Sequence, residues 1–338
     1  MALKHLQNLF GDKLNTLPLL VVYLTDGCNS RCAMCDIWQN PRRNMAMDTV
    51  DQLVNSAVEL SARWVLLSGG EATQHPQWEE AARRFHQAGL HVMLLTNALH
   101  LERQAEKLPN AVHEVIVSLD GGTAATYQHI RGVNGLSRVH AGIKAAKQVG
   151  ARVTTRTTIQ RDNYHELPLI IDNAREAGAD LISFLAVDIS NPFAFGERDD
   201  LYVQNPAALT ADDISAFEQI LNEVETHYED LFDSGQIAES PAKLRRMANY
   251  FRAINGEIPF DGPRCNAPHI STVVEVDGTV RPCYFLPAIG KLNGKTLVDI
   301  LNSESGTALR RAYSTGERQE CARCVCPLYK GPRALATL

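Results

Sequence analysis

The chain has 338 residues, of which 45% are hydrophobic and 21% are charged, and its formal net charge is −6 at pH 7. This composition is typical of a globular protein with one large domain and a smaller one. It excludes a long apolar membrane span and, because no Lys/Arg-rich block occurs, it disfavours a nucleic-acid partner. The first residues also lack the apolar core and cleavage site of a signal peptide. We therefore expect a cytoplasmic protein.

Short apolar runs alternate with helical patterns over the first two hundred residues. The runs are rich in β-branched residues and nearly continuous in apolarity, as expected of strands buried on both faces. Predicted strands cover residues 19–25, 64–68, 91–97, 114–120, 152–160 and 181–187. Predicted helices cover residues 48–62, 76–88, 99–107, 136–149 and 165–177. This alternation predicts an α/β fold with a parallel sheet, and six units instead of eight predict a partial (β/α)6 TIM-like barrel.

The strand–helix alternation ends near residue 190. Two helical patterns follow, at 210–231 and 240–255, with no strand pattern between them. The stretch FAFGERDDLY (193–202) mixes aromatic and charged residues and is a candidate lid. Short strand patterns, a helix near 296–302 and a cysteine-rich tail complete the chain. The predicted segments are a barrel at 1–190, a helical connection at 191–262 and a small C-terminal domain at 263–338.

The eight cysteines form two groups. Thiols stay reduced in the cytoplasm, so this number of cysteines indicates metal or redox chemistry rather than disulfides. The first group follows the first predicted strand, at the edge of a parallel barrel where reactive groups collect. It consists of Cys28, Cys32 and Cys35. The second, looser group consists of Cys265, Cys283, Cys321, Cys324 and Cys326.

Three closely spaced thiols suit an iron–sulfur cubane. Cys thiolates bind the irons of such a cluster, and three ligands leave one of its four irons open to a substrate or cofactor. A structural zinc site needs four protein ligands. His75 or His91 would have to supply the fourth, and neither lies at a recognisable zinc spacing. A zinc knuckle and three buried structural thiols are the alternatives.

Glycines and polar residues follow the second and fourth predicted strands. Gly69 and Gly70 allow the backbone to approach a ligand closely, and Glu71 offers a charge for an ammonium group. Ser118 and Asp120 offer a hydroxyl and a carboxylate suited to a carboxylate or a ribose. These groups are predicted to share one barrel edge with the three thiols.

Two more polar residues are candidates for the site. Arg156 lies in the fifth predicted strand, where a core strand prefers Val or Leu, and we predict that it contacts substrate or cofactor. Asp188 follows the sixth predicted strand and is the candidate catalytic base or hydrogen-bond acceptor. The alternative for Asp188 is a structural cap of a helix or turn.

The sequence resembles the radical S-adenosylmethionine (SAM) enzymes over residues 18–190. Their signature CxxxCxxC is present at residues 28–35, and residues 69–71 match their GGE motif. Ala72 stands where Pro is common, and Met34 stands where an aromatic residue usually precedes the third cysteine. The resemblance implies a [4Fe–4S] cluster whose open iron binds the amino and carboxylate groups of SAM. It also implies reductive cleavage of SAM to a 5′-deoxyadenosyl radical, driven by a low-potential donor such as flavodoxin or ferredoxin.

The resemblance gives roles to the candidate residues. It places Gly69, Gly70 and Glu71 on the cofactor, and the residue types and positions of Ser118, Asp120 and Arg156 add them as predicted cofactor-binding residues. The C-terminal cysteines resemble the auxiliary-cluster domains called SPASM and twitch. A full SPASM domain has more cysteines and holds two clusters, so the five cysteines here imply the shorter twitch type with one auxiliary [4Fe–4S] cluster. Its implied ligands are Cys265, Cys283, Cys321 and Cys324, with Cys326 as a spare or a replacement. A structural zinc site is the alternative.

Three functions fit these patterns. The first, which we predict, is a radical SAM oxidoreductase that oxidises or rearranges a polar small molecule in a biosynthetic reaction, with the auxiliary cluster as electron acceptor or relay. The second is a SPASM-type maturase of a ribosomally made peptide. Because the first predicted strand begins at Leu19, such an enzyme would need a separate recognition partner. The third is a non-catalytic iron–sulfur or zinc protein, against which the GGE and SLDG segments argue.

Overall fold

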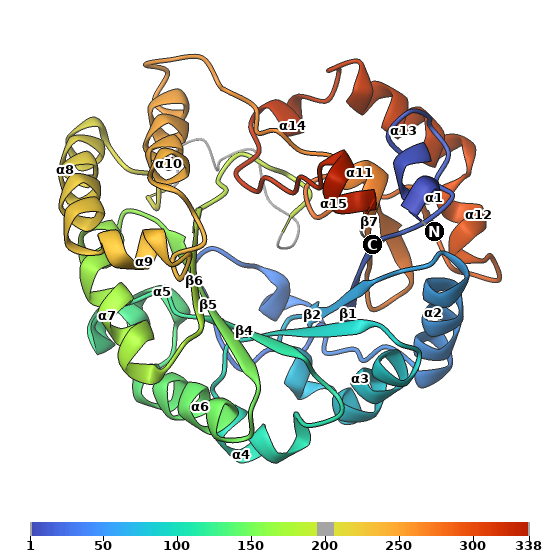
Figure 1. Cartoon of the computed structure of the whole chain (residues 1–338), viewed down its shortest axis with the longest axis horizontal. Coiled ribbons are helices and arrows are strands. Elements are labelled where there is room, and N and C mark those ends of the chain that lie inside the picture. Colours follow the sequence, from blue (N-terminus) through green and yellow to red (C-terminus); the bar gives the residue numbers. More distant parts are fainter. Residues whose placement is uncertain (1, 195–205, 337–338) are drawn as a thin grey trace.

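The computed structural model describes residues 2–194 and 206–336, and its central element is one sheet. The described strands follow the order β6-β5-β4-β3-β2-β1-β7-β8-β9 (Figure 1). All neighbours from β6 to β1 are parallel. These six strands are β1 (Leu19–Thr25), β2 (Trp64–Gly69), β3 (His91–Thr96), β4 (Glu114–Ser118), β5 (Arg152–Ile159) and β6 (Leu181–Ala186). Because β6 and β9 are edges that do not pair, the barrel is partial, which confirms the predicted fold class.

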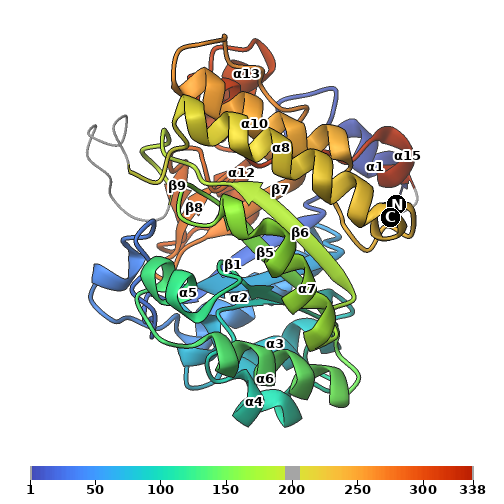
Figure 2. The ribbon, with the colours of Figure 1, turned by 90° about the vertical axis from the view of Figure 1, so that its left-hand side faces the viewer.

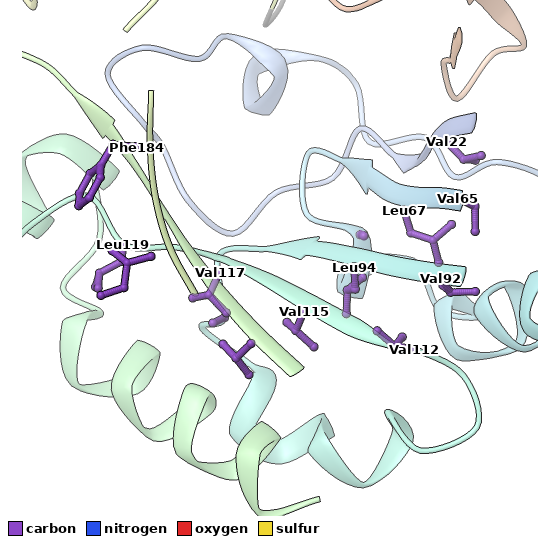
Figure 3. Close-up of a cluster of buried hydrophobic side chains, with 14 of the residues drawn as sticks. Val22, Val65, Leu67, Val92, Leu94, Val112, Val115, Val117, Leu119 and Phe184 are labelled. Carbon is purple, nitrogen blue, oxygen red and sulfur yellow. The ribbon is translucent and has the colours of Figure 1, made fainter. Parts of the chain in front are cut away.

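Helices cover the outer face of the parallel strands (Figure 2). They are α2 (Met47–Glu59), α3 (Trp78–Gln87), α4 (Leu101–Gln104), α5 (Ala124–Arg131), α6 (Leu136–Gln148) and α7 (Leu167–Ala177). Apolar side chains of the strands pack against these helices, and Figure 3 shows Val92, Leu94, Val115 and Val117 among them. Each such Val or Leu contributes about 1.5–3 kcal/mol when fully buried. Alternation along a strand turns the remaining side chains toward the barrel interior.

The C-terminal part of the chain extends the same sheet. β7 (Ser271–Val274) pairs with β1 in parallel, and β8 (Thr279–Arg281) and β9 (Gly290–Lys291) continue in antiparallel pairs. The expected boundary near residue 262 therefore does not coincide with a break in the sheet, because β7 is hydrogen-bonded directly to the first strand. The division of the chain into three segments stays a prediction.

The segment between β6 and β7 is helical, as its pattern predicts. It contains α8 (Ala211–His227), α9 (Glu229–Asp233) and α10 (Pro241–Ile254), and α10 packs on both α8 and β6. Most of the candidate lid, residues 195–202, lies outside the described residues. In the described part of the chain, no helix combines the length and apolarity that crossing a membrane requires.

The remaining elements are short and lie mainly near the chain ends. The helices are α1 (Ala2–Gln7), α11 (Ala267–Ile270), α12 (Leu297–Leu301), α13 (Glu304–Ser314), α14 (Gln319–Ala322) and α15 (Pro332–Ala336). The 3-10 turns are η1 (Ile37–Gln39), η2 (Ala72–Gln74), η3 (Ala105–Lys107) and η4 (Tyr164–Glu166). Helices α1 and α15 pack together, so the two ends of the described chain are neighbours (Figure 1).

Candidate functional site

The three N-terminal cysteines lie in the loop that follows β1, and all are partly buried. Burial raises the pKa of Cys28 to about 11 and that of Cys35 to about 12. Iron takes thiolates, so metal binding here would release protons. No three His, Cys, Asp or Glu side chains within the described ranges could hold a single metal ion. A cubane distributes its thiolates over separate irons, so it suits more widely spaced ligands.

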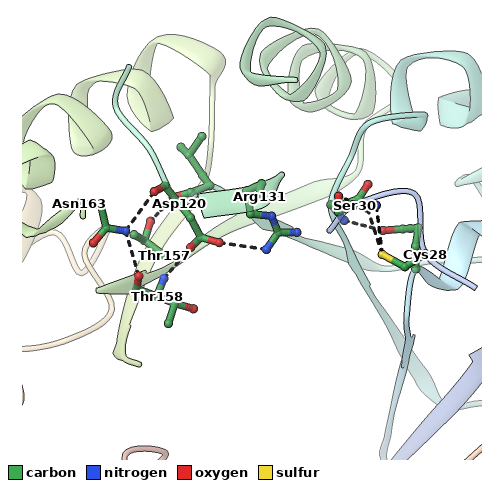
Figure 4. Close-up of polar contacts among 10 residues, drawn as sticks. Cys28, Ser30, Asp120, Arg131, Thr157, Thr158 and Asn163 are labelled. Atoms are coloured by element: carbon green, nitrogen blue, oxygen red, sulfur yellow. Dashed lines mark hydrogen bonds and ion pairs between the residues drawn. The ribbon is translucent and has the colours of Figure 1, made fainter. Parts of the chain in front are cut away.

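Arg131, the last residue of α5, holds the cysteine loop from one side. Its carbonyl oxygen accepts a hydrogen bond from the backbone N–H of Arg31 at 3.1 Å. Its guanidinium donates to Asp120 at 3.0 Å, so it lies between Asp120 and the loop of Cys28 (Figure 4). Burial raises the pKa of all three thiols, and the positive charge of Arg131 opposes that rise. Arg131 is therefore a cation positioned for the first thiol group, with no role assigned from the sequence.

The glycines after β2 allow its end to approach the cysteine loop. Gly69 has φ +128°, and a Cβ there would lie 2.3 Å from the carbonyl oxygen of Thr25. A Cβ on Gly70 would lie 2.6 Å from the carbonyl oxygen of Gly27. The backbone N–H of Gly70 donates to Thr25 at 2.7 Å. The close approach predicted for these glycines is made to the backbone of the loop, and their contact with a cofactor stays a prediction.

The carboxylate of Glu71 is buried and fully hydrogen-bonded inside the protein. Oε1 accepts from the backbone N–H and hydroxyl of Thr73, at 3.1 and 2.7 Å, and from the hydroxyl of Thr96 at 2.7 Å. Oε2 accepts from the backbone N–H of Asn97 at 2.7 Å. Glu71 therefore braces the ends of β2 and β3. Its predicted contact with an ammonium group stays a prediction.

Asn97 connects the end of β3 to the cysteine loop, and sequence reasoning gave it no role. Its Nδ2 donates to Asn29 Oδ1 at 2.7 Å and to Ser30 Oγ at 3.1 Å, and it lies 4.0 Å from Cys28 Sγ. The available signal was its position directly after a buried strand, at the same sheet edge as the cysteines.

Ser118 and Asp120 differ in the hydrogen bonds that their side chains make within the protein. Asp120 is buried, and its carboxylate accepts hydrogen bonds from Arg131 and from the backbone N–H of Thr158 at 2.7 Å (Figure 4). Ser118 ends β4, is partly exposed, and has no side-chain hydrogen bond within the described ranges. Of the two, Ser118 is the group open to a ligand, whereas Asp120 positions Arg131.

The five C-terminal cysteines line one cavity of about 370 Å³, bounded by the barrel interior, α10 and the C-terminal tail. Three of their Sγ atoms accept a backbone hydrogen bond from the residue two positions later, each at 3.4 Å. The pairs are Cys265 with Ala267, Cys283 with Phe285, and Cys324 with Cys326. Cys28 has the same contact with Ser30. Hydrogen bonds of this kind stabilise thiolates and tune iron–sulfur clusters.

Arg156 and Asp188 lie beside this second thiol group. Burial raises the pKa of Cys326, Arg156 opposes that rise, and Asp188 adds to it. Asp188 Oδ1 accepts from the backbone N–H groups of Ser190 and Asn191, both at 2.9 Å, which is the cap expected from its structural alternative. A catalytic role for Asp188 stays a prediction. Arg156 faces the C-terminal thiols, whereas Arg131 is the cation that acts on the first group.

A pair of tyrosines, Tyr23 and Tyr284, lies close to both thiol groups. The ring centroids of Tyr23, in β1, and Tyr284 lie 5.8 Å apart. Burial raises the pKa of Tyr284 to about 12, and the charge of Cys326 adds to the rise. Burial also raises the pKa of Tyr23, which lies within the field of Cys35. One ring of this pair therefore lies near a cysteine of the first thiol group, and the other ring lies near a cysteine of the second.

Two family models match the chain, one over each of the two regions that hold the thiol groups. Residues 22–174 match the Radical SAM superfamily, and residues 265–325 match SPASM, an iron–sulfur cluster-binding domain. The chain therefore carries a radical SAM domain and a SPASM domain. The first domain implies a [4Fe–4S] cluster with SAM, and the second implies auxiliary iron–sulfur clusters. The SPASM match includes the first four C-terminal cysteines, and Cys326 lies just past its end.

The curated relatives of this radical SAM protein act on different molecules. The AdoMet-dependent heme synthase of Methanosarcina barkeri is 32% identical over 169 residues, which are 48% of either chain. This chain thus spans about half the length of that relative. The probable GTP 3′,8-cyclase of Sulfolobus acidocaldarius is 25% identical over 94% of this chain and 92% of the relative. These relatives are enzymes, and their substrates differ.

Solved structures confirm the fold of this radical SAM protein. Streptococcus suis SuiB bound to its precursor peptide SuiA matches with a TM-score of 0.66 and 16% identity. The match covers 99% of this chain and 79% of SuiB. At this level of identity the likeness shows the architecture and leaves the substrate open.

Proposed function

We propose that this radical SAM enzyme oxidises or rearranges a polar small molecule in a biosynthetic reaction, with one auxiliary [4Fe–4S] cluster. The observation that supports this most strongly is the presence of two thiol groups, one in the loop after β1 and one around a cavity of the barrel interior. When bound, the first cluster and SAM supply a 5′-deoxyadenosyl radical that abstracts hydrogen, and the auxiliary cluster supplies an electron acceptor or relay. A low-potential donor such as flavodoxin or ferredoxin is the proposed electron source.

The residues of the chain bind and orient these groups. Cys28, Cys32 and Cys35 hold the SAM-binding cluster, and the amide of Asn97 and the end of α5 fix their loop. The hydroxyl of Ser118 is open to SAM or substrate. Rigid positioning matters because proximity decides which hydrogen atom is removed. The partly buried rings of Tyr23 and Tyr284 pack against each other, with their centroids 5.8 Å apart.

The second thiol group holds the proposed auxiliary cluster. Its ligands are Cys265, Cys283, Cys321 and Cys324, three of which already accept backbone hydrogen bonds. Burial raises the pKa of Cys321 to about 11, so cluster assembly at this site releases protons as it does at the first. Four protein ligands leave no open iron, which suits electron transfer rather than substrate binding.

A small-molecule substrate is favoured by the relatives. The relative that aligns with 94% of the chain is named for a nucleotide substrate. A peptide maturase is the second candidate, because SuiB, which was solved with its precursor peptide, shares the fold over 99% of this chain.

Deuterium transfer distinguishes the two candidates. The reconstituted enzyme would be incubated anaerobically with SAM, a reductant and size-separated fractions of an extract from host cells grown in heavy water. We expect the small-molecule fraction to yield deuterated 5′-deoxyadenosine, which mass spectrometry detects. Deuterium from the peptide fraction would instead support the maturase. No 5′-deoxyadenosine with any fraction or with reductant alone would contradict radical SAM activity.

A further inference from the structure

Arg156 occupies an unusual place for a charged side chain, within strand β5 of the parallel sheet, between β4 and the edge strand β6. It lies opposite Ser118 of β4 and Ser183 of β6, so the three residues form one row across neighbouring strands. The row faces the interior, where Arg156 lines the cavity shared by the five C-terminal cysteines. The side chain of Arg156 therefore lines the proposed auxiliary site on the side of the barrel strands.

The guanidinium of Arg156 makes no ion pair in the described part of the chain, although the carboxylate of Glu239 lies near enough for the two charges to interact. Its Nε is buried without a hydrogen bond, and no carboxylate forms an ion pair with it in the described part of the chain. The nearby carboxylate of Glu239 accepts instead from Ser183 Oγ at 3.0 Å and from the backbone N–H of Phe184 at 2.8 Å. Arg156 is partly buried and makes no ion pair, so an anion that the chain itself does not supply is expected beside it.

The other cations of this cavity are placed differently. Arg246 pairs with Asp261 at 3.4 Å, and Arg323 lies over the ring of Phe260, 5.4 Å from its centroid. Lys243 is exposed on α10, where solvent and salt screen its charge. Among the described cations of this cavity, Arg156 is the one whose Nε is both buried and without a hydrogen bond. The effective dielectric constant around its charge is therefore lower, so its electrostatic interaction with the thiol group is stronger.

We infer that Arg156 is a positioning residue that raises the reduction potential of the auxiliary cluster. A cluster held by four thiolates carries a net negative charge, and each added electron makes it more negative. A fixed positive charge beside it favours the reduced form and makes the cluster a better electron acceptor. This inference rests on the proposed auxiliary cluster.

The test is a redox titration followed by electron paramagnetic resonance. It uses the full chain with Cys28, Cys32 and Cys35 replaced by alanine, so that the auxiliary cluster alone is observed. Arg156→Met is expected to weaken reduction of the cluster at least tenfold, which is a shift of about 59 mV to lower potential for one electron. Arg156→Lys is expected to keep most of the wild-type potential. Lys243→Met, a matched loss of an exposed cation from the same cavity, is expected to change it little.

The outcomes separate this inference from the proposed function. Absence of an iron–sulfur signal in the parent triple variant would remove the auxiliary cluster itself. An intact cluster with an unchanged potential in Arg156→Met would overturn the inference and leave Arg156 as a ligand for an anionic substrate. Loss of the cluster in Arg156→Met and Arg156→Gln but not in Arg156→Lys would overturn it, because the charge would then serve cluster binding rather than the potential. Loss in all three would overturn it in favour of packing.

Discussion

Cys32→Ala is expected to abolish formation of 5′-deoxyadenosine from SAM. Cys32 is one of the three thiols in the loop after β1, and two thiolates cannot hold a cubane with a single open iron. The C-terminal thiols lie in a different cavity, so their iron is expected to remain. The measurement is 5′-deoxyadenosine by liquid chromatography after anaerobic incubation with dithionite, together with iron content.

Cys265→Ala is the matched control for this prediction. It removes a thiol of the second group, so it is expected to lower the iron content while uncoupled cleavage of SAM continues. Equal loss of cleavage in both variants would mean that the two thiol groups do not act separately. Full activity in Cys32→Ala would contradict the assignment of the first group to SAM.

Gly70→Ala is expected to destabilise the protein by about 1–3 kcal/mol, the usual cost of overpacking. The new Cβ would lie 2.6 Å from the carbonyl oxygen of Gly27 and 2.7 Å from that of Asp26, so the backbone of the cysteine loop must move. The movement is also expected to lower cluster binding at the first site. Urea unfolding of the metal-free protein under reducing conditions measures the stability, and iron content after reconstitution measures the loop.

Gly11→Ala provides the comparison, because nothing lies within 4 Å of a Cβ at that position. It is expected to leave stability within about 0.5 kcal/mol of the wild type, as exposed substitutions do. If Gly70→Ala matched Gly11→Ala in both stability and iron content, the close packing of β2 against the cysteine loop would not be required.

The parallel strands could be predicted because a strand that is buried on both faces has a nearly continuous run of apolar residues. Each of the six predicted strands begins at the observed residue, as at Leu19 and Trp64, and ends within two residues of the observed end. The same reasoning places the cysteines at the carboxyl edge of β1. The helix α5 was not predicted, because it is short and depends on a cap by Thr123, whose hydroxyl accepts from the N–H of Thr126 at 3.2 Å.

The contacts within the site were harder to predict because they join distant parts of the chain. Arg31 and Arg131 are one hundred positions apart, and only the fold brings the cysteine loop against the end of α5. The hydrogen bonds of Glu71 likewise depend on the neighbouring strand β3, so its sequence context suggested a free charge. The pairing of β7 with β1 joins the two ends of the chain in one sheet. No local pattern in residues 271–274 identifies that partner.

The number of iron–sulfur clusters bound per chain tests the proposed function most directly. Iron and sulfide content with Mössbauer spectroscopy, after anaerobic reconstitution, would be measured on the wild type and on the Cys28, Cys32 and Cys35 triple alanine variant. Two cubanes predict about eight irons per chain, falling to about four in the variant. About four irons falling to none, with zinc bound by the C-terminal cysteines, would contradict the account, because the proposed oxidation would then have no auxiliary electron acceptor.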